Sequence, residues 1–193
     1  KLKSRIRNYQ TIYRNMSSLT KENINIIVES LNKISNIDLA DLCNITEQSI
    51  KAGGGFGWIE VPTRVKLKNY WNDVVLLSTN KLIVGRLNGA IAGALQLSFQ
   101  PKNNEAQKNI SRIQSHFVAP WARGYGLAKS MIDHSILISK ENNSKSIQLD
   151  IRETQEAAIK LFETKGFVKW GENPSYAFIN GSFIKGFYYY KDL

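Results

Sequence analysis

The first part of the chain is predicted to be helical, because apolar residues recur there every three or four positions. A first helix is expected at residues 21–34, with Thr20 as its N-cap. A second is expected at residues 39–52, before the glycine-rich segment 53–57 interrupts the pattern, and a third at residues 62–78. The apolar face of the first helix would be formed by Ile24, Ile27, Val28 and Leu31.

From residue 81 the pattern changes to short apolar runs bounded by turn residues, which is typical of strands. Asn88-Gly89 and Asn180-Gly181 each stand between two such runs and predict two-residue hairpin turns. Alternation of apolar and polar residues predicts a half-buried strand at residues 147–151. The predicted strands are residues 82–87, 91–100, 110–118, 147–151, 176–179 and 183–190.

Two further helices are expected between these strands, at residues 127–140 and at residues 155–165, where Thr154 is the predicted N-cap and Gly166 the end. Hairpins join antiparallel neighbours, whereas strand–helix–strand crossovers join parallel ones. The order of elements therefore predicts an α/β fold of three layers, with a mixed sheet and helices on both faces. One domain would span residues 1–193, with a helical N-terminal part at 1–80 and a core at 81–193.

The composition narrows the class of protein. Of the 193 residues 42% are hydrophobic, and no apolar run approaches the ~20 residues of a membrane span, so no membrane partner is expected. The single cysteine, Cys43, indicates a reducing, cytoplasmic compartment. The net charge of +10 is concentrated partly in the first 14 residues, but no basic motif with interleaved aromatic residues predicts specific nucleic-acid binding. Two histidines and one cysteine at unrelated spacings give no metal-ligand set.

A turn with two glycines, Arg123-Gly124-Tyr125-Gly126, lies between the strand that ends at Val118 and the helix that begins at Leu127. With little side-chain bulk, successive backbone N–H groups can point outward at the start of the helix. The unpaired N–H groups of a first helical turn, aided by the helix dipole, bind anions, and a diphosphate fits there. The alternative is an ordinary connection between a strand and a helix.

Two other phosphate motifs do not match this turn. A dinucleotide fold needs a third glycine three residues after Gly126, where this chain has Lys129. It also needs the first glycine directly after the strand, whereas Gly124 comes six positions after Val118. A phosphate loop of the ATPase type needs Gly-Lys followed by Ser or Thr, which the chain lacks.

The pattern Arg-x-x-Gly-x-Ala, formed by Arg123, Gly126 and Ala128, resembles the acetyl-CoA pyrophosphate loop of the GNAT N-acetyltransferase superfamily. A second stretch, residues 155–167, is similar to the GNAT pattern Asn-x-x-Ala-x-x-Leu-Tyr-x-x-x-Gly-Phe at its alanine, leucine and Gly-Phe positions. The resemblance extends from about residue 81 to the C-terminus. It implies a GNAT-like sheet whose two central strands splay apart.

Two positions of the second motif differ from the GNAT pattern, with Gln155 in place of the asparagine and Phe162 in place of the tyrosine. The resemblance implies acetyl-CoA as cosubstrate and no metal. Its pantetheine arm would lie between the splayed strands and its pyrophosphate on the loop. The implied cofactor-binding residues are Phe117, Val118, Arg123, Gly124, Tyr125, Gly126, Leu127, Ala128, Gln155, Ala158 and Phe162.

In the implied reaction an amine attacks the acetyl carbon directly and expels the CoA thiolate. A backbone N–H near Val118 would polarise the thioester carbonyl, and a general base would take the amine proton. His116, Glu153, Glu60 and Tyr176 are candidates for that base, although a histidine in an apolar strand also fits a packed core residue. The predicted catalytic residues are Val118, His116, Glu153 and Tyr176.

The glycine-rich segment at residues 53–57 would line the acceptor pocket, with Phe56 and Trp58 as substrate contacts, or would simply connect two helices. The expected function is N-acetylation of a small primary amine, and residues 152–158 resemble tabtoxin-resistance-type acetyltransferases. The alternatives are acetylation of a protein or peptide and CoA binding without catalysis. The oligomeric state stays open, with a homodimer among the alternatives.

Overall fold

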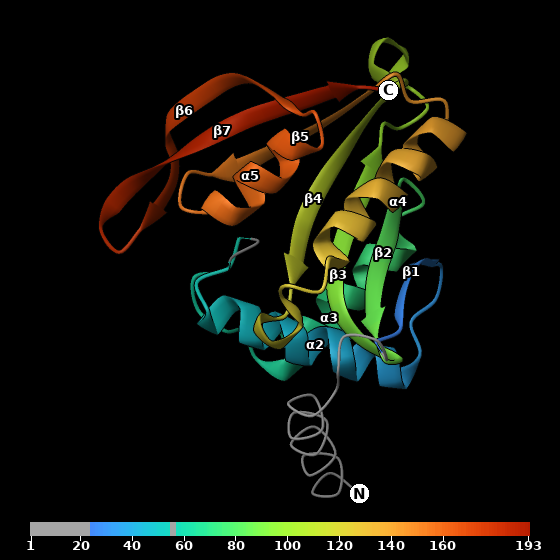
Figure 1. Cartoon of the computed structure of the whole chain (residues 1–193), viewed down its shortest axis with the longest axis vertical. Helices are drawn as coiled ribbons and strands as arrows, with labels where there is room; N and C mark the ends of the chain where they lie inside the picture. The colour runs from blue at the N-terminus through green and yellow to red at the C-terminus, as the bar shows by residue number, and fades with distance from the viewer. Residues whose placement is uncertain (1–23, 55–56) are drawn as a thin grey trace, which may run out of the picture.

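The computed structural model describes residues 24–54 and 57–193. In this part of the chain a seven-stranded mixed sheet runs in the order β1-β2-β3-β4-β5-β7-β6. Helices α2 and α3 lie on one face, and α4 and α5 lie on the other (Figure 1). The elements are β1 (Ile26–Leu31), α2 (Asn36–Lys51), α3 (Arg64–Leu76), β2 (Asn80–Leu87), β3 (Ala90–Phe99), β4 (Ile110–Val118), α4 (Leu127–Glu141), β5 (Ser146–Arg152), α5 (Glu156–Thr164), β6 (Val168–Ile179) and β7 (Ser182–Asp192).

The predicted three-layer α/β fold is confirmed, and both hairpins turn where the Asn-Gly pairs predicted. Asn88 and Gly89 join β2 to β3, and Asn180 and Gly181 join β6 to β7, with all four residues at positive φ. Positive φ at both central residues is the requirement of a type I′ turn. The hairpins are antiparallel and the β4–β5 pair is parallel, as the crossover helix requires.

The strand β1 corrects the prediction of a helix at residues 21–34. Residues 26–31 form an edge strand that pairs antiparallel with β2, in the register Ile26↔Leu87 to Leu31↔Leu82. Three β-branched residues in succession, Ile26, Ile27 and Val28, favour extended backbone, and the free edge of β2 supplies the hydrogen bonds. The predicted N-cap, Thr20, lies outside the described residues. The segment before residue 80 is therefore not wholly helical.

The second correction concerns the start of α5. The N-cap is Gln155 rather than Thr154, and no side chain caps the helix there. Gly166, at a φ of 78°, ends the helix as predicted.

The core is centred on β2 and β3, which helices cover on both sides. A Cβ atom at Gly85 would lie 2.7 Å from Leu127 of α4, and one at Gly93 would lie 2.8 Å from the Met131 side chain. These two glycines therefore let α4 approach the sheet closely. On the other face α2 is joined to β3, where the buried carboxylate of Asp41 accepts the Ile91 N–H at 3.2 Å.

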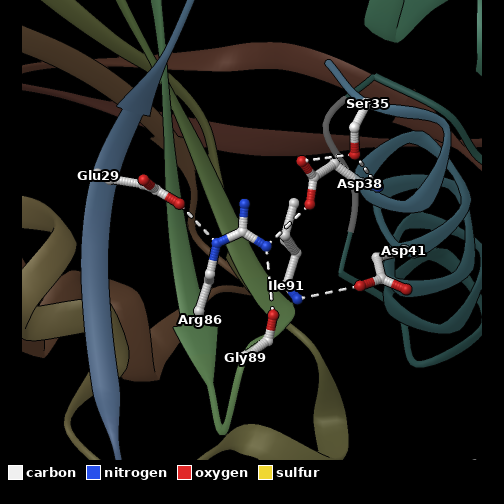
Figure 2. Close-up of polar contacts among 7 residues, drawn as sticks. All are labelled: Glu29, Ser35, Asp38, Asp41, Arg86, Gly89 and Ile91. Carbon is white, nitrogen blue, oxygen red and sulfur yellow. Dashed lines mark hydrogen bonds and ion pairs between the residues drawn. The ribbon is translucent and has the colours of Figure 1, made fainter. Parts of the chain in front are cut away.

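Arg86 of β2 joins β1, α2 and the turn between β2 and β3 (Figure 2). It donates to Glu29 at 2.5 Å, to Asp38 at 2.8 Å and to the carbonyl of Gly89 at 3.3 Å. Ser35, the N-cap of α2, accepts the Asp38 N–H at 3.1 Å and donates to its carboxylate at 2.9 Å. Burial alone would raise the pKa of Asp38, but the hydrogen bonds from Arg86 and Ser35, with the Arg86 charge, outweigh it and lower the pKa.

The central strands β4 and β5 separate after a short paired stretch. Their pairing covers only Ile110↔Ser146 to Arg112↔Gln148, although β4 continues to Val118 and β5 to Arg152. Figure 1 shows the two strands running apart below this point. The splayed central pair implied by the GNAT resemblance is thus confirmed. No helix in the described ranges is long and apolar enough to cross a membrane.

Candidate active site

A cavity of about 1430 Å³ lies where β4 and β5 separate. Its walls come from β4, the start of α4, the ends of β5 and β6, α5 and the segment that follows α2. The predicted site residues that line it are Trp58, His116, Phe117, Val118, Arg123, Gly124, Gly126, Leu127, Ala128, Gln155, Ala158, Phe162 and Tyr176. Tyr125 and Glu153 are not among its lining residues, and Phe56 lies outside the described part of the chain.

The start of α4 forms one end of the cavity. Gly126 is the N-cap at a φ of 82°, no side chain caps the helix, and its first turn carries no acid. The first N–H to bond within the helix is that of Ser130, to the Gly126 carbonyl at 3.0 Å. The N–H groups of the preceding turn therefore have no helical acceptor. A Cβ at Gly124 or Gly126 would meet no atom within 4 Å, so the space above the turn is open. This geometry fits a diphosphate.

The backbone of Val118 is directed into the gap between the strands. Ala119 donates its N–H to the carbonyl of Ala92 in β3 at 2.8 Å. Because successive N–H groups of a strand point to opposite sides, that of Val118 points away from β3. The Val118 N–H therefore points toward β5. Because the last residue of β4 that pairs with β5 is Arg112, this N–H faces the open gap between the two strands. The amides of a pantetheine arm have hydrogen-bond partners in such a strand edge.

A bulge in β4 redirects the side chains just before Val118. The β3–β4 register shifts between Ala94 and Gln96, and Ser115 has a φ of 50°. Ser115 lies 3.3 Å from the hydroxyl of Tyr70 in α3, which also accepts a hydrogen bond from Gln96 at 2.5 Å. These three polar side chains come from three elements and form a chain beside the cavity.

His116 lies on the side of β4 that faces α5. Its ring packs edge-on against Phe162, with 5.6 Å between centroids, and its Nε2 is buried without a hydrogen-bond partner. Burial lowers the pKa of His116 to about 4, against a smaller opposing effect of the Ala128 backbone. The imidazole is therefore neutral near pH 7 and is a weak proton acceptor.

Phe162 is 3% exposed and also packs edge-on against Phe167, at 5.2 Å between centroids. The ring position of the GNAT tyrosine is thus filled, but the side chain has no proton to give.

Tyr176 and Glu153 have different surroundings. The Tyr176 hydroxyl donates to the carboxylate of Asp150, and burial together with this hydrogen bond raises the pKa of the phenol. Tyr176 therefore stays protonated near pH 7, and its role as a base remains a prediction. The carboxylate of Glu153 accepts the backbone N–H of Lys185 at 3.1 Å, which attaches the end of β5 to β7.

The segment after α2 reaches the cavity from the opposite side. Gln155 donates its side-chain amide to the carbonyl of Gly53 at 3.2 Å, so the start of α5 contacts this segment directly. Trp58 packs edge-on against Tyr70 with 4.7 Å between ring centroids. Trp58 therefore forms part of the cavity wall, and its contact with Tyr70 of α3 holds its ring in place.

Three polar residues of the cavity region were missed from sequence: Tyr70, Ser115 and Asp150. In the sequence, Asp150 is one of the polar residues that alternate with apolar ones in a predicted strand. Tyr70 belongs to a predicted helix that is distant in sequence from the strands of the cavity. An alternating pattern marks exposed positions but does not distinguish those that face a cavity.

Cys43 is buried, and burial raises the pKa of its thiol, which makes it a packing residue and a poor nucleophile. Among the described residues there is no group of three or more His, Cys, Asp or Glu side chains that could hold a metal ion.

Residues 48–167 match the family model described as the acetyltransferase (GNAT) family. An uncharacterized N-acetyltransferase in the hisH-hisA intergenic region of Azospirillum brasilense is 40% identical to this chain over 130 residues. The match covers 67% of this chain and 77% of that protein.

Solved structures show the same fold. An N-acetyltransferase from Staphylococcus aureus Mu50 superposes with a TM-score of 0.74 at 20% identity, over 87% of this chain and 98% of that chain. The yncA protein from Salmonella typhimurium, solved with its cofactor acetyl-CoA, superposes with a TM-score of 0.71 at 14% identity. That match covers 87% of this chain and 94% of the other.

The seven-stranded mixed sheet with its covering helices is the fold that this chain shares with these solved structures. With the family match over residues 48–167, the chain belongs to the GNAT acetyltransferase family. It is accordingly an acetyl-CoA-dependent acyltransferase.

Proposed function

We propose that the protein transfers the acetyl group of acetyl-CoA to the primary amine of a small molecule, by direct attack in a ternary complex. The observation that carries this proposal is the single cavity that begins at the open start of α4 and continues to polar side chains of β4, β5 and β6. One end suits the diphosphate of the cosubstrate, and the other suits a polar acceptor. Both substrates can therefore meet in one space, which supplies much of the rate acceleration.

The cosubstrate would be held mainly by backbone groups. The N–H groups of residues 124–128 would bind the diphosphate, with Arg123 at the rim of the turn. The backbone of Phe117 and Val118 would pair with the pantetheine amides along the free edge of β4. Ala158 and Phe162 would contact the arm from α5.

The transfer step requires few side chains of the protein to take part. The amine nitrogen attacks the acetyl carbon, and the N–H of Val118 stabilises the oxyanion that forms. Collapse of this intermediate breaks the C–S bond and releases the CoA thiolate. A thiol with a pKa of about 8.5, by analogy with cysteine, leaves with little help from an acid, so Phe162 is compatible with catalysis.

A small acceptor is favoured over a peptide by the walls of the cavity. The end of β6 and Trp58 bound it on the acceptor side, and Gln155 contacts Gly53 near the same end. Small free amines are also the substrates implied by the tabtoxin-resistance-type resemblance of residues 152–158. Acetylation of a peptide is the second candidate, and an acceptor panel separates the two.

The cosubstrate site is tested with Lys129→Glu. Lys129 is exposed in the first turn of α4 and lines the cavity. A glutamate there suits the helix dipole, so the fold should keep its stability, but the charge repels a diphosphate. We expect CoA affinity, measured by calorimetric titration, to fall at least tenfold, or about 1.4 kcal/mol.

The matched control is Lys108→Glu, an exposed residue before β4 that does not line the cavity and makes the same change in net charge. Its affinity should stay within twofold of the parent. Equal affinities for all three proteins would contradict the phosphate site. Thiol release from acetyl-CoA across polyamines, amino acids, aminoglycosides and peptides then tests the acceptor class, and turnover with peptides alone would replace the small-amine proposal.

A further inference from the structure

Asp150 of β5 is a carboxylate in the acceptor half of the cavity that none of the motifs pointed to. It is exposed and lines the cavity, and it accepts the hydrogen bond of the Tyr176 hydroxyl. Its side of the sheet follows from the register. Asp150 pairs with Tyr188, and the neighbouring Leu149 pairs with Tyr189, whose hydroxyl donates to Glu163 of α5 at 3.0 Å.

Because alternate residues of a strand face opposite sides, Asp150 lies on the face away from α5. The proposed cosubstrate contacts, Phe162 and the start of α4, belong to the helices of the opposite face. The gap between β4 and β5 joins the two faces. Asp150 is therefore reached from the side on which an acceptor would approach the acetyl group.

Three features of the chain hold Tyr176 over Asp150. The β6–β7 register shifts between Asn173 and Ala177, so the strand carries extra residues at this point. Asn173 accepts the N–H of Ser175 at 2.9 Å, which fixes the bulge. Gly186 in β7 leaves room for the ring, since a Cβ there would overlap the Tyr176 side chain. A bulge and a glycine notch of this kind direct a side chain to a chosen place.

The charge of Asp150 identifies its ligand. Acetyl-CoA carries its negative charges at the phosphate end, and its pantetheine and acetyl groups are neutral, so the cosubstrate offers no cation to this carboxylate. A primary amine is an ammonium ion near pH 7 and must lose a proton before it can attack. A carboxylate in the acceptor half can bind that ion and accept the proton. Arg152, on the same face, contributes a positive charge beside Tyr176.

We propose that Asp150 binds the ammonium group of the acceptor and accepts its proton, and that Tyr176 is a positioning residue that orients the carboxylate. This assignment rests on the proposed small-amine function. In the step, one N–H proton moves from the ammonium to an Asp150 oxygen, and the freed nitrogen lone pair forms the bond to the acetyl carbon. The C–S bond breaks, and its electron pair leaves with the CoA sulfur. That sulfur takes up the second proton, which the nitrogen loses as the amide forms, so the products are the N-acetyl amide and the CoA thiol.

The test uses Asp150→Asn, which keeps the shape of the side chain and removes its charge. With the best amine of the acceptor panel, kcat/KM should fall at least a hundredfold, while CoA affinity by calorimetry stays within twofold. Tyr176→Phe should raise the KM for the amine severalfold with a smaller change in kcat. Added formate should restore part of the rate to Asp150→Ala and none to Tyr176→Phe. If Asp150 had only a structural role, formate would not restore the rate of Asp150→Ala.

The matched control is Asp73→Asn, which removes an exposed carboxylate of α3 outside the cavity and should keep full activity. If Asp150→Asn acetylates the amine as fast as the parent, the Asp150 assignment is wrong and the proposed function stands. If no panel amine is acetylated or binds to the CoA complex, both proposals are wrong. Loss of folding in Asp150→Asn would be detected as a loss of CoA binding, and Asp150→Glu would then replace it, with partial activity expected.

Discussion

At the scale of single residues, the cavity contains one histidine whose environment decides its chemistry. His116 is neutral near pH 7 because burial lowers its pKa to about 4, and its Nε2 has no hydrogen-bond partner. The sequence allowed either a catalytic base or a packed core residue at this position. The contact with Phe162 and the lowered pKa favour the packed residue, and its role as a base remains an untested prediction.

A pH dependence of stability follows from His116. Its folded pKa of about 4 lies below the unfolded value of about 6.5, so the unfolded chain takes up the proton first as the pH falls. Stability should therefore decline between pH 6.5 and pH 4. Between pH 7 and pH 5 the parent should lose about 2 kcal/mol more than His116→Leu, measured by urea unfolding.

His134→Leu is the matched control for this experiment, since it removes the other histidine and leaves His116 in place. Because it keeps His116, this variant should still lose more stability than His116→Leu as the pH falls from 7 to 5. Asp38 contributes in a different window: its pKa is lowered, so its stabilising effect is present above pH 3.8 and is lost as the pH falls through the folded value. Parallel curves for the parent and His116→Leu down to pH 5 would show that His116 is not held neutral by the fold.

At the scale of elements, local signals predicted those parts of the fold that depend on neighbouring residues. The Asn-Gly pairs determine both hairpins, because they accept positive φ at two successive positions. The helical periodicity at residues 24–31 was misleading, because the pairing of β1 with β2 is a contact with a distant segment. The bulges in β4 and β6 also depend on distant partners, and they direct Ser115 and Tyr176. Contacts of this kind leave no local pattern.

The close packing of α4 on the sheet predicts different results for two glycine substitutions. A Cβ at Gly93 would lie 2.9 Å from the backbone oxygen of Phe117, so Gly93→Ala must displace β4 itself. We expect a loss of about 1–3 kcal/mol in the free energy of unfolding, as for other overpacked sites. CoA affinity should fall severalfold, because Val118 moves with its neighbour.

Gly85→Ala is the comparison, because the nearest atoms to a Cβ there belong to the flexible side chain of Leu127. Its cost in stability should be smaller, and its CoA affinity should stay within threefold of the parent. Urea unfolding and calorimetric titration of both variants make the test. A CoA affinity that falls equally in both would mean that the position of β4 does not control the cosubstrate site.

At the scale of the whole molecule, the sheet consists of two parts joined along a short seam. One part carries β1 to β4 with α2, α3 and α4, and the other carries β5 to β7 with α5 (Figure 1). Besides three paired positions of β4 and β5, the described contacts across the seam include the ion pair of Lys165 with Asp133 and the bond from Gln155 to Gly53. The cavity lies within this seam, so a ligand that fills it touches both parts.

Binding of CoA should therefore stabilise both sides of the seam together. At a CoA concentration of 100 times Kd, mass action adds about 2.7 kcal/mol to the free energy of unfolding. Hydrogen exchange should slow in β4 beyond Arg112, at the start of α4 and in α5, because the proposed binding mode places CoA against each of them. The Lys129→Glu variant at the same CoA concentration should show a weaker effect at all three places. Slower exchange at the start of α4 alone would place the pantetheine arm outside the gap, and the acceptor would then have to meet the acetyl group elsewhere.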